Sequence, residues 1–301
     1  MKHAYCIMAH TDPYCLETLI GLIDYEGNDV YLHIDRKASH DIGKGLKTEK
    51  AGLNIIPFEK RIDVRWGGLS QVKAELLLFE TALNTGEYDY IHLISGADLP
   101  LKSQKVIHDF FNSQPKGSNF VAFSSGDAIE KNVAFKTRYY HPFVEYQRFR
   151  NDGSFLHRIE DFSAKVVRNL TVKTQKLISA KRNWNDLEIK KGSQWVSISS
   201  DFARYLVDRK NYILRRFRGV ICPDEIFLQT MLYNSPFAST VVKDNLRKID
   251  WERGTPYTWR QEDFPELINS DALFARKFFS VTDSKIISRI KEANKSVNKD
   301  Q

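Results

Sequence analysis

Residues 3–35 read HAYCIMAHTDPYCLETLIGLIDYEGNDVYLHID, and this stretch decides the class of fold. Residues 3–9 and 30–35 are short apolar runs of the length of a buried strand, whereas residues 14–25 place apolar side chains at helical spacing. A strand, a helix and a second strand in this order are typical of a parallel sheet that helices cover on both faces.

The same alternation continues through the first half of the chain. Further strands are predicted at residues 54–58, 90–94 and 119–123, and further helices at residues 69–83 and 104–112. We therefore expect an α/β fold with a mainly parallel central sheet. Because such sheets bind ligands at the carboxyl ends of their strands, we expect chemistry in the loops that follow Ala9, Asp35 and Ile94.

The second half of the chain is expected to complete the same domain. The predicted elements are a strand at residues 195–198, helices that start at Ser200 and Pro223, a strand near residues 240–242 or 246–249, and an acidic helix at residues 262–268. A polar helix that frays is predicted at residues 284–301. Because no internal repeat or low-complexity linker interrupts the sequence, we expect residues 1–301 to form a single domain.

A basic segment at residues 149–191 interrupts the sheet-forming pattern. Its apolar residues recur at helical spacing with lysines and arginines between them, which predicts one or two amphipathic helices inserted into the sheet domain. Two interpretations stay open. The segment either covers the core and exposes a solvated basic face, or it contacts a membrane surface or a partner.

The whole chain is basic, with a formal net charge of +7 and a pI near 9.1. This charge favours an anionic partner, either a phosphate-bearing ligand, a membrane surface or nucleic acid. The cations are spread along the sequence and no nucleic-acid-binding motif occurs, so nucleic acid is not expected as a partner.

The three cysteines, Cys6, Cys15 and Cys222, are far apart and odd in number. They match neither a disulfide framework nor a zinc site and are interpreted as small core residues, which favours a reduced, cytosolic compartment. No run approaches about 18 apolar residues, so neither a signal peptide nor a membrane anchor is expected. A role at a membrane would place the protein on its surface.

Several phosphate-binding and metal-binding motifs are absent from the sequence. Residues 9–13 read AHTDP, so the first strand is not followed by the G-x-G-x-x-G turn of dinucleotide-binding proteins, and no P-loop occurs. No two aspartates lie two positions apart, which removes the D-x-D pair that holds a divalent ion on a nucleotide-sugar diphosphate. If the protein handles a diphosphate, we expect fixed cations to neutralise it.

Two short motifs carry residue types that such chemistry needs. Residues 273–278 read LFARKF and place Arg276 beside Lys277. The forked guanidinium of the arginine and the compact ammonium of the lysine can then bind the same diphosphate. Residues 222–225 read CPDE, and Glu225 falls in the first turn of a predicted helix, where the helix dipole stabilises an anion and suits a general base. A surface Arg–Lys pair and an ordinary helix start are the simpler alternatives.

Three further motifs suit the binding of a sugar or a nucleobase. Residues 95–100, SGADLP, place Asp98 on a loop directly after a strand, where it can hold a sugar hydroxyl. Residues 191–195, KGSQW, end on Trp195, which suits stacking on a sugar and equally a place in the core. Residues 66–68, WGG, set the Trp66 ring beside glycines that allow either a close approach or a tight turn.

In combination and in this order, the motifs resemble glycosyltransferase family 14, the "Branch" family of core-2/I-branching β-1,6-N-acetylglucosaminyltransferases and peptide O-xylosyltransferases. The matching pieces span almost the whole chain: residues 9–10 (AH), 33–38 (HIDRKA), Trp66, 95–100 (SGADLP), 192–195 (GSQW), 223–225 (PDE) and 273–278 (LFARKF). The resemblance implies a GT-A-type, Rossmann-like nucleotide-sugar-binding fold, inversion of configuration and no requirement for a divalent metal.

The resemblance also implies how the donor is held. Asp35 is expected to hydrogen-bond the uracil of a UDP-sugar, and Trp66 with its neighbour Gly67 to pack on it. Main chain at Ala9 and His10 completes this expected base pocket.

On the diphosphate, Arg276 and Lys277 are expected to take the place of a metal ion. Arg247 is a candidate for the additional upstream arginine of the branching enzymes, and Glu225 matches the catalytic base. The sugar and acceptor side is expected to be lined by Asp98, Arg138, Gln194 and Trp195. Xylosyltransferases carry an aspartate where this chain has Gln194, which argues against a xylosyl donor and a peptide acceptor.

We therefore expect an inverting, metal-independent glycosyltransferase that moves a sugar from a UDP-sugar to a hydroxyl of a glycan acceptor. N-acetylglucosamine is the first sugar expected, and no cofactor is expected beyond the donor. The missing anchor and disulfides resemble a bacterial cytoplasmic member that builds surface polysaccharide on a lipid-linked oligosaccharide, in peripheral contact with the anionic inner face of the cell membrane. The alternatives are a non-catalytic carbohydrate-binding protein, which needs no base, and an NAD(P)-dependent oxidoreductase, which lacks its glycine fingerprint here.

Overall fold

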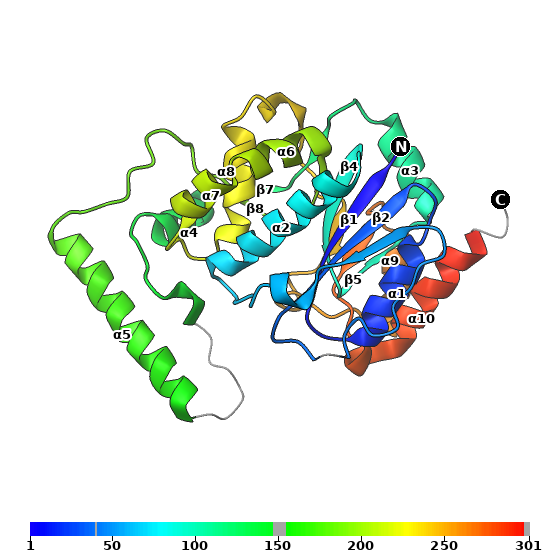
Figure 1. Cartoon of the computed structure of the whole chain (residues 1–301), viewed down its shortest axis with the longest axis horizontal. Coiled ribbons are helices and arrows are strands. Elements are labelled where there is room, and N and C mark those ends of the chain that lie inside the picture. The colour runs from blue at the N-terminus through cyan, green and yellow to red at the C-terminus, as the bar shows by residue number, and fades with distance from the viewer. Residues whose placement is uncertain (40, 147–154, 298–301) are drawn as a thin grey trace.

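The computed structural model describes residues 1–39, 41–146 and 155–297. Its centre is a seven-stranded sheet with the strand order β10-β6-β9-β4-β1-β2-β3 (Figure 1). β1 (His3–Ala9) lies parallel to β2 (Asn28–Ile34) on one side and to β4 (Tyr90–Ser95) on the other, and β3 (Gly52–Ile55) continues the parallel part beyond β2. The predicted α/β class with a mainly parallel central sheet is confirmed.

The other end of the sheet contains the antiparallel pairs. β9 (Val196–Ser199) runs antiparallel to β4 and to β6 (Asn119–Phe120), and β10 (Val241–Val242) is parallel to β6. The strand predicted at residues 119–123 is broken, because β7 (Phe123–Ser124) leaves the sheet and pairs with β8 (Lys191–Gly192). Gly192 permits this pairing, since a Cβ there would lie 1.8 Å from the Ala122 carbonyl oxygen.

Two apolar cores cover the two faces of the central sheet. Alternate residues of β1 point to opposite faces, so Tyr5 and Ile7 join one core while Cys6 and Met8 join the other. The first core is completed by α1 (Pro13–Ile23), α3 (Gln104–Ser113) and α10 (Ser280–Val297). The second is completed by α2 (Leu69–Thr85), α6 (Ser200–Asp208), α7 (Lys210–Phe217) and α8 (Phe227–Tyr233).

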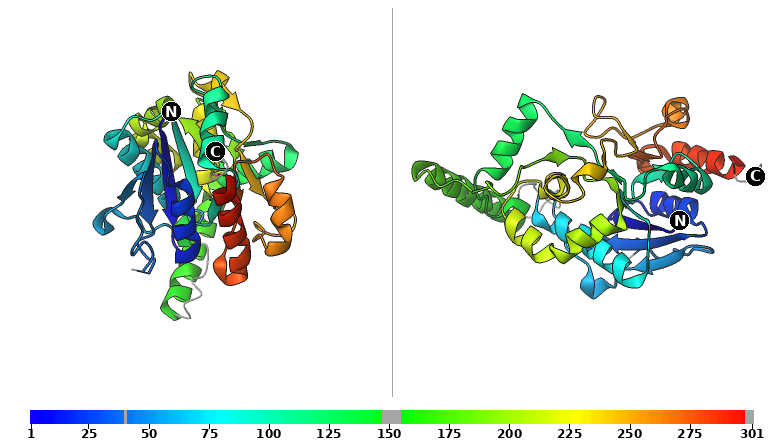
Figure 2. Two further views of the ribbon diagram at one scale, coloured as in Figure 1. Left: turned by 90° about the vertical axis from the view of Figure 1, so that its right-hand side faces the viewer. Right: turned by 90° about the horizontal axis from the view of Figure 1, so that it is seen from above.

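α10 corrects the prediction of a polar helix near the C-terminus. Ile286, Ile287 and Ile290 are fully buried in the first core, so the helix is amphipathic, and α1 and α10 lie side by side (Figure 2). Asp12 joins the two helices, because its side chain caps α1 and also accepts hydrogen bonds from Ser280. The predicted fraying at residues 298–301 lies outside the described residues.

A second, three-stranded sheet lies beside the central one. Its middle strand β12 (Phe274–Arg276) runs parallel to β11 (Arg247–Ile249) and antiparallel to β5 (Asp98–Pro100), which places Arg276 directly opposite Asp98. Asp98 was predicted in a loop. It lies in a strand instead, because β5 finds its partner far along the sequence.

The remaining elements outside the insertion are short. The helix predicted from Pro223 is a 3-10 turn, η3 (Pro223–Glu225), followed by α8, and both alternative strands near residues 240–249 form, as β10 and β11. The other short elements are η1 (Phe58–Lys60), η2 (Val144–Tyr146), η4 (Ala238–Thr240), η5 (Gln261–Asp263) and α9 (Phe264–Ile268).

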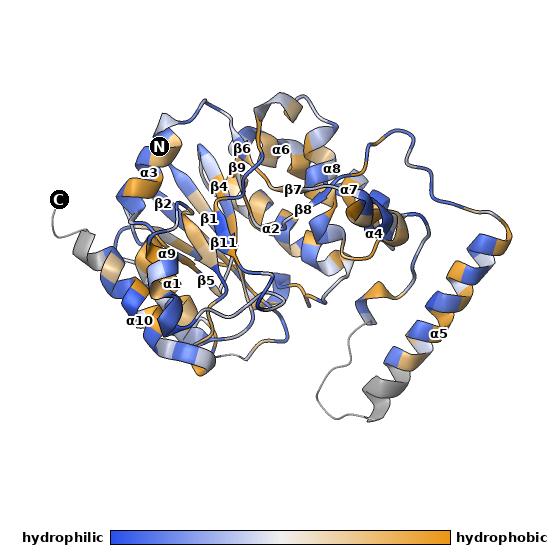
Figure 3. Cartoon of the chain, turned by 180° about the vertical axis from the view of Figure 1, so that it is seen from behind, coloured by the Kyte–Doolittle hydropathy of each residue, from blue (hydrophilic) through white to orange (hydrophobic). Residues whose placement is uncertain are grey.

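The insertion is helical, as predicted. It contains one long helix, α5 (Phe155–Leu177), which projects away from the rest of the molecule (Figures 1 and 3). α4 (Asp127–Thr137), which was not predicted, precedes it. Within the part of the chain that the structure describes, no helix has both the length and the apolar composition needed to cross a membrane. Cys6, Cys15 and Cys222 are buried free thiols.

Candidate active site

The carboxyl ends of β1, β2 and β4 meet at one edge of the central sheet. Asp35, which follows β2, donates its N–H to the Ala9 carbonyl at 2.8 Å, and Gly96, which follows β4, donates its N–H to the Met8 carbonyl at 2.9 Å. The loops that were expected to carry chemistry therefore lie next to one another.

Four charged side chains act on the ring of His10, which directly follows β1. Desolvation has the largest effect on the His10 pKa and lowers it; Asp35 raises it, while Arg276, Lys37 and Lys277 lower it further. The net direction is downward, so the ring is neutral at pH 7. The carboxylate predicted to bind a base and the two cations predicted to bind a diphosphate thus all act electrostatically on one side chain.

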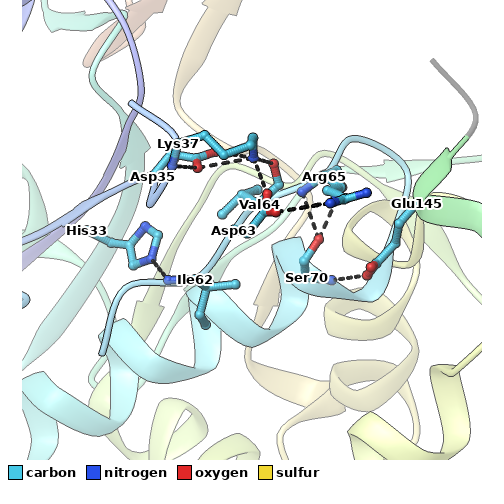
Figure 4. A network of polar contacts seen from close by, with 9 residues as sticks. All are labelled: His33, Asp35, Lys37, Ile62, Asp63, Val64, Arg65, Ser70 and Glu145. Carbon is cyan, nitrogen blue, oxygen red and sulfur yellow. Dashed lines mark hydrogen bonds and ion pairs between the residues drawn. The ribbon is translucent and has the colours of Figure 1, made fainter. Parts of the chain in front are cut away.

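Lys37 organises the end of β2. Its ammonium lies 3.1 Å from both carboxylate oxygens of Asp35, contacts Asp63 and donates to the Val64 carbonyl at 2.6 Å (Figure 4). Asp35 is only 8% exposed, so this ion pair supplies the partner that a nearly buried carboxylate requires. Lys37 belongs to the motif HIDRKA, but no role was predicted for it from the sequence.

Buried polar contacts fix the segment that leads to Trp66. His33 is fully buried and accepts the Ile62 N–H at 2.9 Å through Nε2, and burial lowers the His33 pKa to about 4, so the nitrogen stays able to accept (Figure 4). Next to Trp66, the Arg65 N–H donates to the Ser70 hydroxyl at 2.8 Å. The Trp66 ring, 48% exposed, is therefore presented from an ordered turn.

The Trp66–Gly67 turn is bonded to the turn that carries Glu225. Gly67 has a φ of 74° and its carbonyl accepts the Cys222 N–H at 2.9 Å. Gln71 links the same two turns, because its Oε1 accepts the Gly67 N–H at 2.9 Å and its Nε2 donates to Asp224 at 3.2 Å. The two turns are thus held next to each other by three hydrogen bonds.

Glu225 is held by two ammonium groups. Its Oε2 lies 2.9 Å from Nζ of Lys136 on α4 and 3.3 Å from Nζ of Lys191 on β8. Partial burial alone would raise the Glu225 pKa, but the hydrogen bond and charge of Lys136, with the charge of Lys191, outweigh burial and lower it. Glu225 is therefore an ionised carboxylate at neutral pH, the state that a general base requires.

Two buried acids, Asp224 beside Glu225 and Glu75 on α2, act on each other. Burial and then the charge of Glu225 raise the pKa of Asp224 to about 7, and burial followed by the charge of Asp224 raises the pKa of Glu75 well above its ordinary value. Gln194 donates its amide to Glu75 Oε1 at 2.8 Å. The side chain of Gln194, predicted to line the sugar site, is thus held by Glu75, a residue of α2 that was not singled out from the sequence.

The raised pKa of Asp224 predicts a pH-dependent stability. With a pKa of about 7 in the folded chain against 3.8 in the unfolded one, the contribution of Asp224 is complete below pH 3.8, declines above it, and is lost once pH has risen through 7. Asp224→Asn keeps an acceptor for Gln71 and removes this loss. We expect urea unfolding to show the variant more stable than wild type by about 2–4 kcal/mol near pH 8, with little difference near pH 4. A difference independent of pH would contradict a protonated Asp224.

Arg276 is oriented by two neighbours. Its Nη1 donates to Asp98 at 2.7 Å, and its guanidinium lies 4.4 Å from the centre of the Trp195 ring. Asp98 is fully buried and its other oxygen accepts the Ser95 N–H at 2.9 Å, so this carboxylate faces Arg276 and the main chain. The structure therefore places Asp98 and Trp195 as supports of Arg276.

With this geometry in place, comparison with known proteins identifies the family. The family model described as core-2/I-branching enzyme matches residues 3–271 of the chain. The chain belongs to the core-2/I-branching enzyme family. This membership agrees with the GT-A-type α/β class that the motifs implied.

Similar members of the core-2/I-branching family are sugar transferases by name. Xylosyltransferase oxt of Drosophila melanogaster is 25% identical over 87% of this chain and 30% of its own length. Beta-glucuronosyltransferase GlcAT14A of Arabidopsis thaliana is 24% identical over 87% of this chain and 57% of its own length. The chain thus spans about a third to a little over half of these relatives.

The similarity to solved structures is more remote. Mouse xyloside xylosyltransferase 1 in its apo form is 10% identical, with a TM-score of 0.36, and the match covers 90% of this chain and 96% of the mouse chain. Core-mannan synthase A of Aspergillus fumigatus is 12% identical, with a TM-score of 0.35, over 80% of this chain and 72% of that one.

Two of the predicted site residues of this branching-family member make contacts other than the expected ones. Arg247 is 7% exposed and donates to the Val196 carbonyl at 2.7 Å and to the Ser197 hydroxyl at 2.9 Å. Burial lowers its pKa to about 10. Its guanidinium is therefore engaged inside the fold, where the Asp98 carboxylate that pairs with Arg276 also acts on it. Arg138 is exposed at the end of α4, whose Lys136 reaches Glu225 instead.

Proposed function

We propose that this core-2/I-branching family member is a glycosyltransferase that moves a sugar from a UDP-sugar to a hydroxyl of a glycan, with inversion and without a divalent metal. The proposal rests on the sheet edge where such folds bind nucleotides: the Asp35 N–H is bonded to the Ala9 carbonyl, the Phe278 N–H that follows Arg276 and Lys277 is bonded to the Ala97 carbonyl, and the charges of Asp35, Arg276 and Lys277 all act on His10. Family membership and the names of the relatives support sugar transfer.

In this proposal, one group of residues binds the base of the donor and another binds its diphosphate. Asp35 hydrogen-bonds the uracil, Trp66 packs on its face, and main chain at Ala9 and His10 closes the base pocket. Arg276 and Lys277 meet the diphosphate, where fixed positive charge neutralises the leaving group as a metal ion does elsewhere. Support comes from the Asp98 carboxylate and the Trp195 ring, which hold the Arg276 guanidinium in place before any ligand arrives.

Glu225 is proposed to act as the general base. The acceptor hydroxyl oxygen attacks the anomeric carbon and forms the new glycosidic bond, the bond from that carbon to the diphosphate breaks, and the hydroxyl proton passes to Glu225. Lys136 and Lys191 both approach Oε2, and the proposal assigns the acceptor proton to Oε1. The electron pair of the broken bond leaves with UDP, whose diphosphate faces Arg276 and Lys277.

The proposal also covers the donor sugar and the class of acceptor. N-acetylglucosamine is the first donor to test, because Gln194 stands where xylosyltransferases carry an aspartate, which argues against xylose. A glycan or lipid-linked oligosaccharide of surface polysaccharide synthesis is the proposed acceptor, which places the proposed site of action in the cytoplasm.

The test is UDP release from a panel of UDP-sugars with EDTA present throughout. We expect slow hydrolysis of one donor, unaffected by EDTA, and faster release when its acceptor is added. If no donor turns over, UDP binding is titrated through Trp66 fluorescence, with NAD as the control ligand. Absence of UDP binding would overturn the proposal, and loss of activity with EDTA alone would overturn the fixed-cation account.

A further inference from the structure

α5 has its apolar stripe on the outside. Phe162, Val166, Leu170 and Leu177 follow one another at helical spacing and are 67%, 40%, 58% and 86% exposed. Soluble proteins bury such a stripe against the core. Of the sixteen large apolar side chains exposed in the described residues, five lie on α5 and a sixth directly follows it, so the exposure is concentrated here.

The inner side of α5 is polar and is bonded to the body of the protein. Gln175 accepts the Tyr140 N–H at 2.9 Å and donates to the Tyr140 carbonyl at 2.8 Å, and the small residue Ala164 is buried. The orientation of the helix is thus fixed by a paired hydrogen bond. The outward direction of the stripe is fixed by these contacts, and Figure 3 shows that apolar positions recur along α5, the helix that projects from the main body.

The charge around the stripe is positive. Lys173 lies three positions after Leu170 and four before Leu177, so it shares their face, and Lys165 and Lys176 are exposed on the same helix. Within residues 161–178 the sequence has one acidic residue, Asp161, against three lysines and one arginine. A second copy of this chain would bring these cations against their equivalents, which disfavours self-association through this face.

We infer that the outward face of α5 docks onto an anionic lipid surface. The apolar side chains enter the boundary between headgroups and acyl chains, and the lysines reach the lipid phosphates from the edge of the stripe. The inference rests on the exposure and charge of α5 and not on the proposed sugar transfer. Docking would nevertheless serve that transfer, because it brings the enzyme to the surface where a lipid-linked acceptor lies.

Hydrogen bonds join the docking helix to a residue that lies close in sequence to the candidate active site. Lys136, which lies 2.9 Å from Glu225, is the second-last residue of α4. Tyr140, the residue bonded to Gln175 of α5, lies only four positions after Lys136. The position of the lipid-facing helix is therefore tied to the segment that supplies a partner to Glu225.

The experiment is co-sedimentation of the full chain with vesicles of phosphatidylcholine, with or without phosphatidylglycerol, at low and at physiological salt. We expect binding to the anionic vesicles only, weakened by salt. Phe162→Asp with Leu170→Asp is expected to lower the partition coefficient at least about tenfold, and Lys173→Glu about fivefold or more. Val281→Asp and Lys44→Glu, at exposed sites elsewhere, are the matched controls and are expected to bind as wild type.

Two further readouts keep the result unambiguous. Thermal unfolding checks that each variant is folded, and UDP release from a soluble donor is expected to be unchanged, which separates docking from chemistry. Failure of the wild type to bind anionic vesicles at low salt would overturn the inference, as would α5 variants that bind as tightly as the controls. A concentration-dependent oligomer in light scattering, abolished by the α5 variants, would assign the face to self-association and overturn it too.

Discussion

Replacing Glu225 by glutamine will lower sugar transfer by about 10²–10⁴-fold and leave UDP binding close to the wild-type value. Glutamine keeps the shape of the side chain but cannot take the proton of the acceptor hydroxyl. The donor contacts proposed for Asp35, Trp66, Arg276 and Lys277 are not touched. Initial rates of UDP release and calorimetric titration with UDP measure the two quantities separately.

Lys136→Met is the informative companion to this variant. It keeps the Glu225 carboxylate and removes the nearer of its two ammonium partners, at 2.9 Å. Because Lys136 lowers the Glu225 pKa, its removal raises that pKa and moves the acidic limb of the rate profile to higher pH. Glu225→Gln that retains wild-type turnover, or Lys136→Met with an unshifted profile, would show that the base is another residue.

Lys277→Ala will weaken UDP binding and lower turnover together, by about 10²–10³-fold in turnover. The ammonium is proposed to meet the diphosphate both in the bound donor and when negative charge develops on the leaving group. The measurement compares the affinities of UDP and uridine. The loss is expected for UDP and not for uridine, whose contacts lie at the base pocket.

Lys277 is a cleaner target than its neighbour Arg276. Arg276→Ala would leave Asp98 buried without its ion-pair partner, and removing one member of a buried pair costs several kcal/mol of stability, on the order of 3–5. A loss of folding could then be mistaken for a loss of binding. Equal losses for UDP and uridine in Lys277→Ala would contradict the proposed contact with the diphosphate.

Local patterns in the sequence predicted the parts of the fold that they determine. β1 was expected at residues 3–9 and has those bounds, because a short and mostly apolar run is typical of a central strand buried on both faces. α4 was not predicted, since Thr137 is its one buried residue and no apolar stripe marks it. α10 was expected to be polar, because three isoleucines among many charges give a weak pattern.

The contacts within the candidate site depend on long-range packing. Lys136 and Glu225 are 89 positions apart, and Gln71 and Asp224 are 153 apart, so no local pattern links them. The motifs located Glu225, Arg276 and Lys277 as chemically suitable residues. The burial of Arg247 inside the fold could not be read from its neighbours in sequence.

The pairing of β5 with β12 has a consequence for how the protein is made. Asp98 and Arg276 are 178 positions apart, so a ribosome that adds roughly 5–20 residues per second needs on the order of ten seconds or more between them. During that interval β5 has an open edge and Asp98 has no counter-ion to accompany it into the interior. β5 and Asp98 therefore cannot reach their final paired positions until the last quarter of the chain, which contains β12, has been synthesised.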